Sequence, residues 1–277
     1  MFCVNIGNTN AGIAVIQNTV NRCSEFEKRI INSFADNIVF ETKFRIKNEI
    51  NEESFQNLKN ALIKKKISNR DINECAVSSV VPEINRRVAG LFKKYFGIKP
   101  FVITYDRKLK LKQKIKIKHP ETIGTDRIAN VECCLEKYGT DGNLIIVDSG
   151  TAATIDVVKQ GDFTGGVITP GVYLLRDSLA ESCSKLYKIQ INNPPGKIAG
   201  KETKECLESG VIHGYGSMIE GLIKKIIKEE KFKNYRIICA GGSADLLNKL
   251  VNLKIITDKN ITYKGIEIIY ENNKKNI

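Results

Sequence analysis

Apolar residues occur along this chain as short continuous runs in some segments and at helical spacing in others. Short runs bounded by glycine, proline or polar residues are typical of buried strands, whereas recurrence every three or four residues indicates an amphipathic helix. The runs predict strand pairs at about residues 2–17 and 146–158, and single strands at about 40–46, 75–81, 100–104 and 236–240. The helical spacing predicts helices at about residues 51–63, 84–96, 125–138 and 205–229, and another after residue 244. Strands that alternate with helices indicate an α/β fold.

Two segments lie between these predicted elements. Residues 18–37 are polar and irregular, and we expect a long loop with a helical turn there. Residues 165–171 begin with two adjacent glycines and end in Pro-Gly, which favours a turn. No low-complexity linker divides the chain, so we expect two lobes with a cleft between them rather than domains on a flexible tether. The expected lobes are residues 1–118 and 119–277.

A strand–turn–strand pattern occurs twice, at residues 4–15 and 146–158. Each copy has an Asn or Asp, a glycine two residues later, and then Asn or Thr in the turn. Glycine in such a turn lets backbone N–H groups approach an anion, and Asn8, Thr9 and Thr151 add side-chain donors. A single copy is more typical of a tight hairpin, but two copies favour phosphate binding by both lobes. Asp148 of the second copy is also able to hold a cation, whereas the first copy has Asn5.

Lysine occupies every even position from 108 to 118. Period 2 predicts a strand with one cationic face and one mostly apolar face. The simpler interpretation is an edge strand that lysine protects from aggregation. The functional interpretation is a cationic wall that attracts anionic substrates.

The predicted helix at 205–229 contains four glycines, at positions 210, 214, 216 and 221. Each costs about 1 kcal/mol relative to alanine in a helix. Close approach of another helix would offset this cost, for example across a dimer interface.

Composition excludes several classes of protein. The 277 residues are 42% hydrophobic and 27% charged, which is typical of a globular chain, and no apolar run is long enough to span a membrane. The net charge of +13 is spread along the chain without a nucleic-acid-binding motif, so a nucleic-acid partner is not expected. The eight cysteines show no Cys-x-x-Cys spacing and predict reduced core thiols in the cytoplasm rather than disulfides or a zinc site.

Residues 124–127, Gly-Thr-Asp-Arg, open the predicted helix at 125–138. A helix N-terminus has free N–H groups and partial positive charge, so Asp126 has an ordinary role there as a cap. A second role is chemical, because a carboxylate accepts a proton from a hydroxyl while the Arg127 guanidinium binds a carboxylate or phosphate.

Together these segments resemble the type III pantothenate kinases of the acetate/sugar kinase and actin-like ATPase superfamily. The motifs are Asn-Ile-Gly-Asn-Thr at 5–9, Ser-Ser-Val-Val-Pro at 78–82, Gly-Thr-Asp-Arg-Ile-Ala-Asn at 124–130, Val-Asp-Ser-Gly-Thr-Ala at 147–152, Gly-Gly-Val-Ile-Thr-Pro-Gly at 165–171, Gly-Lys-Glu-Thr at 200–203, Ser-Gly at 209–210 and Gly-Gly at 241–242. Their order and spacing is far more specific than any one of them. The resemblance implies two ribonuclease H-like lobes with a nucleotide cleft between them. It also implies ATP-dependent phosphorylation of pantothenate to 4'-phosphopantothenate, the first step of coenzyme A synthesis.

The resemblance also implies roles for individual residues. Asp126 matches the general base, and Gly124, Thr125 and Arg127 match its companions in binding pantothenate. Thr203 matches a substrate contact near the interface of a homodimer, and Asp148 the ligand of a monovalent cation, K⁺ or NH₄⁺, used alongside Mg²⁺. The residues that match ATP contacts are Asn5, Ile6, Gly7, Asn8, Thr9, Asn10, Ala11, Gly12 and Thr151. Gly241 and Gly242 follow a buried predicted strand, which is typical of an ordinary strand-to-helix turn, but their position also suits a nucleotide base or ribose lying on the backbone.

Three positions depart from the family pattern. Asn5 stands where the family usually has Asp, Ile117 where it has a substrate-binding Tyr, and Tyr187 where it has the Pro of Lys-Leu-Pro. Asn5 has no charge with which to hold Mg²⁺, which predicts a slow or Mg²⁺-demanding kinase. Two alternatives stay open: a catalytically impaired homologue that binds nucleotide and regulates, and a kinase for another small hydroxy acid.

Overall fold

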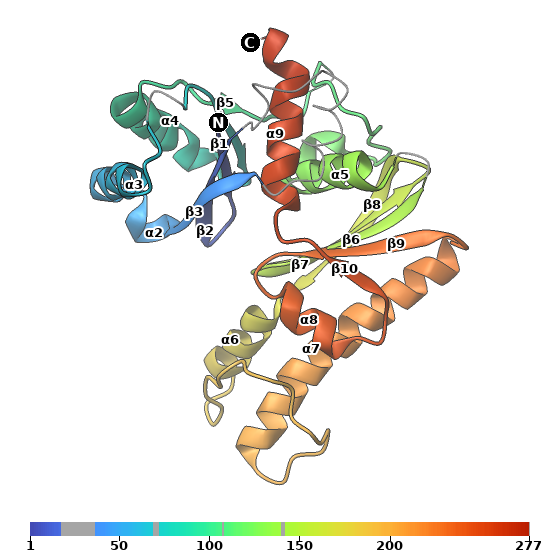
Figure 1. Cartoon of the computed structure of the whole chain (residues 1–277). Helices are drawn as coiled ribbons and strands as arrows, with labels where there is room; N and C mark the ends of the chain where they lie inside the picture. The colour runs from blue at the N-terminus through green and yellow to red at the C-terminus, as the bar shows by residue number, and fades with distance from the viewer. Residues whose placement is uncertain (18–36, 69–71, 107, 140–141, 277) are drawn as a thin grey trace. The chain divides into compact units, whose positions relative to one another are not determined.

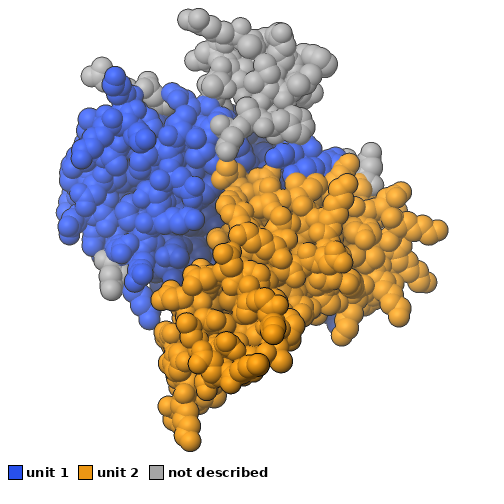
Figure 2. All heavy atoms as spheres, turned by 60° about the horizontal axis from the view of Figure 1, so that its bottom comes forward, with its two compact units in different colours: residues 1–114, 118–140, 261–277 blue, residues 115–117, 141–260 orange. Residues whose placement is uncertain are grey.

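The computed structural model of the chain describes residues 1–277 except 18–36, 69–71, 107, 140–141 and 277. The loop predicted at 18–37 therefore lies, apart from Asn37, outside the described residues. The chain forms two compact units, coloured separately in Figure 2. Unit 1 consists of residues 1–114, 118–140 and 261–277, and unit 2 of residues 115–117 and 141–260.

Unit 1 is built on a five-stranded sheet with the order β3-β2-β1-β4-β5 (Figure 1). Its strands are β1 (Phe2–Ile6), β2 (Asn10–Ile16), β3 (Ile38–Arg45), β4 (Cys75–Ser79) and β5 (Phe101–Val102). Its α-helices are α2 (Ile46–Glu49), α3 (Glu52–Lys64), α4 (Pro82–Phe96), α5 (Thr125–Tyr138) and α9 (Ile261–Asn273), with short 3₁₀ turns at Pro120–Thr122 and Lys274–Asn276. β1, β4 and β5 run parallel, whereas β2 and β3 are antiparallel to their neighbours.

Helices cover both faces of the unit 1 sheet. On one face, Phe2, Val4 and Ile6 of β1 pack with Phe55 of α3 and Phe92 of α4 in one buried cluster. On the other face α5 and α9 pack against each other and against β1 and β4 (Figure 1). The two helices cross closely, because a Cβ on Gly265 would run into the backbone carbonyl of Ala129.

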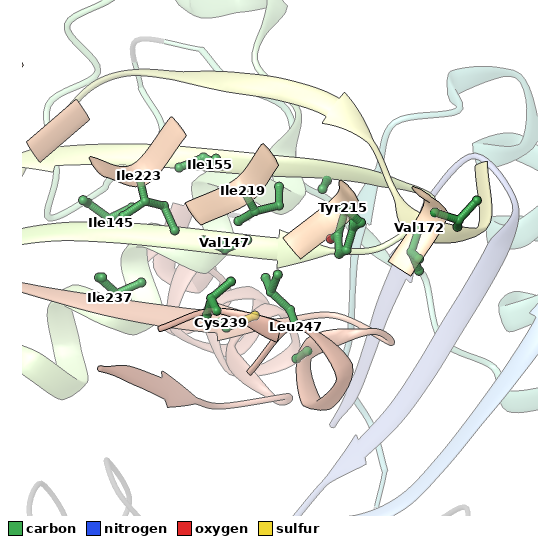
Figure 3. Packing of buried hydrophobic residues seen from close by; sticks show 14 of the residues in the cluster. Ile145, Val147, Ile155, Val172, Tyr215, Ile219, Ile223, Ile237, Cys239 and Leu247 are labelled. Carbon is green, nitrogen blue, oxygen red and sulfur yellow. The ribbon is translucent and has the colours of Figure 1, made fainter. Parts of the chain in front are cut away.

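Unit 2 has a second five-stranded sheet, with the order β10-β9-β6-β7-β8. Its strands are β6 (Asn143–Ser149), β7 (Ala152–Lys159), β8 (Asp162–Pro170), β9 (Tyr235–Ala240) and β10 (Ile255–Thr257). Its helices are α6 (Val172–Ser182), α7 (Thr203–Glu229) and α8 (Ala244–Leu250). The buried face of α7 lies over β6, β7 and β9, as Figure 3 shows.

The repeat predicted from the sequence extends to the whole topology of the two sheets. β1 pairs antiparallel with β2 and parallel with β4, and β6 pairs antiparallel with β7 and parallel with β9. Asn5 and Asp148 each occupy the penultimate position of their strand. The α/β prediction and the two-lobed repeat are confirmed at this level.

In unit 2, one prediction was wrong and two elements were not predicted. The turn predicted at 165–171 was wrong, because residues 162–170 form β8 and pair with β7 across a register shift. Gly165 there has φ +151°, so glycine serves an irregular strand instead of a chain reversal. Helix α6 and strand β10 were not predicted, and neither was α9 of unit 1.

The strand predicted at 108–118 was also wrong. Its side chains do alternate, with every even lysine exposed and every odd residue more buried, but the backbone forms only one isolated bridge, between Ile115 and Phe163. The buried carboxylate of Glu132 on α5 accepts hydrogen bonds from the N–H groups of Lys112 and Gln113. The Asn273 side chain holds both backbone groups of Lys110. Side chains of α5 and α9 therefore replace a strand partner.

The division into compact units differs from the expected lobe boundary at 118/119. Residues 119–138 and 261–277, expected in the second lobe, pack in unit 1 because α5 and α9 cover the β1–β4 face of its sheet. Within the described part of the chain no helix has the length and apolar character of a membrane span. Of the cysteines in that part, Cys183 and Cys206 are exposed rather than in the core, while the rest are buried and all are free thiols.

Candidate active site

The first turn, residues 7–10, connects β1 to β2 and closes with a hydrogen bond from Gly7 N–H to the Asn10 carbonyl, 3.0 Å long. Asn8, Thr9 and Asn10 are exposed on the surface of unit 1. The Thr9 carbonyl accepts a hydrogen bond of 3.0 Å from Ile46 N–H, which ties the turn to the end of β3. Two residues matched to ATP contacts, Ile6 and Ala11, have side chains in the core and therefore offer only backbone groups.

Asn5 lies beside this turn in a row that crosses the sheet. It pairs with Ser78 of β4 on one side and with Gly12 of β2 on the other, and Gly12 pairs with Lys43 of β3. Directly paired residues point to the same face, so this row faces α5 and α9. The Asn5 Oδ1 atom is buried and has no hydrogen-bond partner among the described residues. The position thus holds a neutral acceptor that none of the described residues uses.

Gly12 has a structural reason to be glycine that the sequence did not reveal. The Tyr263 hydroxyl of α9 occupies the space that a Cβ on Gly12 would need. Tyr263 also donates a hydrogen bond of 3.3 Å to Glu41 of β3. Burial and the nearby Glu41 carboxylate raise the pKa of Tyr263, so the phenol stays protonated and able to donate. Gly12 therefore admits α9 to the sheet rather than standing open to a ligand on this face.

The start of α5 is anchored to the end of β4. The buried Thr125 hydroxyl shares a hydrogen bond of 2.8 Å with the Ser78 hydroxyl and accepts one of 3.1 Å from Ser79 N–H. β1 and β4 are parallel and both end here, and ligands of open α/β sheets bind at such carboxyl ends. The structure thus brings the Gly-Thr-Asp-Arg motif and the first turn to one edge of the unit 1 sheet. It also engages the Thr125 side chain in positioning α5.

Asp126 is half-buried in the first turn of α5. Its Oδ1 accepts a hydrogen bond of 2.8 Å from Arg127 N–H. Burial raises the pKa of this carboxyl above its ordinary value, while the Arg127 N–H and guanidinium act in the opposite direction. A carboxylate with a raised pKa is a better proton acceptor than an exposed one, which is the property that a general base needs.

The second turn, residues 150–152, connects β6 to β7 in unit 2 and closes with Gly150 N–H donating to the Ala152 carbonyl at 3.1 Å. Asp148 lies just before it and Thr151 is exposed within it. Gly241 stands against this turn, because a Cβ there would lie 2.5 Å from Asp148 Oδ1 and 2.6 Å from the Ser149 carbonyl. Its φ of +88° also favours glycine. Two oxygens therefore face the space that a side chain at 241 would fill.

A cavity of about 570 Å³ opens beside Gly242 in the same unit. Its walls carry the amide side chains of Asn192 and Asn193, one cation and one aromatic ring. The lining residues are Tyr173, Ile191, Asn192, Asn193, Gly242, Ser243, Leu246 and Lys249. Lys249 Nζ donates to Asn193 Oδ1 at 3.4 Å, so the cation is held at the cavity wall.

Thr203 is exposed at the first position of α7. It precedes Tyr215, which contacts Ser149, by twelve residues, or about 18 Å of helix. The structure therefore does not bring Thr203 to the second turn of its own unit. Ile117 is half-buried in the irregular segment that replaces the predicted strand, and Tyr187 is exposed.

Sequence reasoning missed two cations next to the first turn. Lys43 pairs with Gly12 and Arg45 pairs with Asn10, so both share the sheet face of Asn5. Both are exposed. Their alternation with Phe44 in the predicted strand at 40–46 was the available signal, because period 2 already placed them on the face opposite the core.

The family model and the curated relatives that match this chain carry the same description. A sequence model of the family described as type III pantothenate kinase matches residues 1–225. A type III pantothenate kinase of Persephonella marina is 40% identical over 200 residues, covering 72% of this chain and 76% of its own. One from Desulfatibacillum aliphaticivorans is 30% identical over 273 residues, covering 98% of both chains.

Solved structures share the fold at low sequence identity. A protein from Campylobacter jejuni described as a Baf family transcriptional activator has a TM-score of 0.55 and 17% identity, covering 99% of this chain and 100% of its own. The activator of 2-hydroxyisocaproyl-CoA dehydratase from Clostridium difficile, with bound ADPNP, has a TM-score of 0.50 and 9% identity, covering 100% and 97%. At these identities the likeness concerns the fold alone.

Proposed function

The chain belongs to the type III pantothenate kinase family, and we propose that it phosphorylates pantothenate with the first turn, the start of α5 and the second turn. The family match over residues 1–225 is the observation that carries this function. The reaction transfers the γ-phosphoryl group of ATP to the primary hydroxyl of pantothenate and releases ADP. It is the first step of coenzyme A synthesis.

Asp126 acts as the general base in this proposal. The pantothenate hydroxyl oxygen bonds to the γ-phosphorus, the bond from that phosphorus to the bridging oxygen of ADP breaks, and the hydroxyl proton goes to Asp126. The raised pKa of Asp126 supports this role. Arg127 binds the pantothenate carboxylate, Gly124 leaves room for the base, and Thr125 contributes through its anchored position. Such transfer depends mainly on positioning and charge stabilisation.

We assign ATP-phosphate contacts to residues of each turn. In the first turn the donors are Gly7, Asn8, Thr9 and Asn10, and in the second it is Thr151. Ile6 and Ala11 take part only through backbone groups because their side chains are buried. Lys43 and Arg45 add positive charge on the face of Asn5, and Lys43 Nζ lies 3.6 Å from the Glu41 carboxylate on the same face. The base and ribose occupy the cavity beside Gly242, since its amides and Lys249 offer both donors and acceptors.

The kinase uses a divalent metal with ATP, and we assign a monovalent cation, K⁺ or NH₄⁺, to Asp148. The donor set fits: Asp148 Oδ1 and the Ser149 carbonyl border the same space at Gly241, and hard cations prefer oxygen ligands. The described residues contain no group of three or more His, Cys, Asp or Glu side chains that would hold a metal by themselves. This supports Mg²⁺ being held mainly by ATP, with Asn5 as a neutral acceptor. A bound cation supplies charge stabilisation for the transferring group.

A homodimer completes the proposal. Gly210 and Gly214 lie on the exposed side of α7, where a Cβ would have no described atom within 4 Å, and the same holds for a Cβ on Gly221. A second copy packing there would use the close approach that these glycines permit. Thr203, remote from its own second turn, would then serve the partner's substrate. We place the enzyme in the cytoplasm, without a nucleic-acid or membrane partner.

A coupled ADP-release assay with pantothenate, Mg²⁺ and K⁺ tests this function. ADP release that depends on pantothenate and yields 4'-phosphopantothenate is the expected result. ATP binding without turnover would favour a catalytically impaired, regulatory homologue, for which the neutral Asn5 is the relevant observation. Turnover of a different hydroxy acid alone would assign another substrate, which Ile117 at the position of the family tyrosine leaves room for.

A further inference from the structure

Tyr215 lies on the buried face of α7, which continues past it to Val211 and Leu207. Ile223, Ile219 and Tyr215 follow one another along the buried side of the helix, as Figure 3 shows. Tyr215 is completely buried. Its hydroxyl lies 2.5 Å from the hydroxyl of Ser149, which is also completely buried. Two buried hydroxyl groups thus satisfy each other at the end of β6.

Ser149 is the last residue of β6, between Asp148 and the second turn. Its backbone carbonyl accepts a hydrogen bond of 3.0 Å from Ser243 N–H and also borders the space at Gly241. Its side chain has Tyr215 as its partner. The strand end that carries Asp148 on one side and Thr151 on the other is therefore connected to α7 by the hydrogen bond between Ser149 and Tyr215.

The helix that supplies this hydroxyl is itself closely held. A Cβ on Gly216, the next residue, would lie 2.6 Å from the Leu250 Cβ at the end of α8. Burial raises the pKa of Tyr215 to about 12, so the phenol keeps its proton at physiological pH. The hydroxyl consequently has a fixed place and a fixed protonation state.

We propose that Tyr215 is a positioning residue, which holds the end of β6 so that Asp148 and Thr151 meet the cation and the ATP phosphates. This inference rests on the roles proposed for Asp148 and Thr151. Tyr215 touches neither ATP nor pantothenate in this proposal and acts through the Ser149 hydroxyl. A buried hydrogen bond of this kind gives orientation that packing alone does not, because it is directional.

A double-mutant cycle tests the proposal. Tyr215→Phe removes one hydroxyl and keeps the ring, and Ser149→Ala removes the other. Each is expected to raise the KM for ATP and the half-activating K⁺ concentration by about 5-fold, the effect of losing one net hydrogen bond. The KM for pantothenate at saturating ATP stays unchanged. Both substitutions break the same hydrogen bond. The KM for ATP of the double variant is therefore expected to be no higher than that of the single variant with the higher KM.

Tyr235→Phe, on the exposed end of β9, is the matched control and is expected to leave all constants unchanged. A purely structural role would lower the melting temperature of Tyr215→Phe without moving the KM for ATP, and that outcome overturns the proposal. Additive effects of the two substitutions overturn it as well. If one single variant does not fold, the KM for ATP of the other still shows the effect of breaking the hydrogen bond. The affinity of each variant for a non-hydrolysable ATP analogue is measured by titration for the same double-mutant cycle. This measurement does not require pantothenate to be the substrate. It therefore separates failure of this inference from failure of the proposed function.

Discussion

The carboxylate of Asp126 occupies the space that a side chain on Gly124 would need. Gly124 precedes the first residue of α5, and Asp126 folds back over it to accept the Arg127 N–H. A Val80 methyl carbon lies 3.3 Å from the same position and restricts any escape. The conformation of the proposed base is therefore set by the absence of a side chain two residues earlier.

Gly124→Ala is expected to lower kcat/KM for pantothenate by about 100-fold, because a displacement of about 1 Å in a catalytic group has that effect. ATP binding, measured by calorimetry, is expected to stay within a factor of two or so. Gly90→Ala on α4 is the matched control, since no atom of the described residues lies within 4 Å of a Cβ there. Unchanged kinetics in Gly124→Ala would mean that the Asp126 orientation seen here is not the working one.

The pH dependence of activity follows from the raised pKa of Asp126. The base must be ionised, so kcat/KM for pantothenate is expected to fall as pH decreases through that pKa, with a midpoint above the ordinary value of 3.8.

Asp126→Asn is expected to abolish turnover and spare ATP binding. Normal turnover in this variant would show that Asp126 is not the base.

As pH rises and Asp126 ionises, the free energy of unfolding is expected to decrease while the activity increases. A raised pKa in the folded state means that ionised Asp126 costs stability, up to about 1.4 kcal/mol per pKa unit. This cost is absent below the unfolded pKa and complete above the folded one. Asp126→Asn is therefore expected to unfold at higher denaturant concentration than the parent at neutral pH, with the difference shrinking as pH falls. A variant less stable than its parent at pH 7 would contradict this.

Asn5→Asp tests whether the neutral amide limits the enzyme. A carboxylate charge about 5 Å from Mg²⁺, in an effective dielectric of about 20, contributes about 3 kcal/mol to metal binding. The Mg²⁺ concentration needed for half-maximal activity is therefore expected to fall by at most about 100-fold. Without Mg²⁺ the variant is expected to be less stable than the parent, since Asn5 Oδ1 is buried without a described partner. Turnover and urea unfolding over a Mg²⁺ series measure both effects. No gain at any Mg²⁺ concentration would show that Asn5 is not a handicap.

Lys43→Gln and Arg45→Gln test the cations beside the first turn. Each is expected to raise the KM for ATP by about 3- to 5-fold at low salt, because exposed charge pairs are worth up to about 1 kcal/mol. The effect should fade at high salt as screening increases. Lys64→Gln, at the end of α3, is the control. Equal responses of all three variants would point to overall charge rather than to this face.

Gly214→Arg tests the proposed dimer. The exposed site on α7 has open space within the chain, so the protomer is expected to fold with an unchanged helix content. The bulky side chain prevents close approach of a second copy, and sedimentation over a concentration series is expected to show monomers. Gly90→Arg, on the surface of α4, should leave the parent's association unchanged. A parent that is monomeric at all concentrations would refute the dimer itself.

Local pattern determined much of this protein in advance. The two strand–turn–strand copies, the helix at 125–138 and the Gly-Thr-Asp-Arg motif were readable because strands, turns and caps depend on neighbours close in sequence. The order of the motifs was enough to identify the family, which the matches over most of the chain confirm.

Other features depended on partners that lie far away in sequence. Residues 165–170 became a strand because β7 offered backbone partners, and residues 110–113 did not because Glu132 and Asn273 took their N–H groups. Tyr263 approaches Gly12 across most of the chain, and Tyr215 meets Ser149 across 66 residues. Buried polar groups take whichever partner the packed helices bring to them, so only the tertiary structure decided how each turn is held.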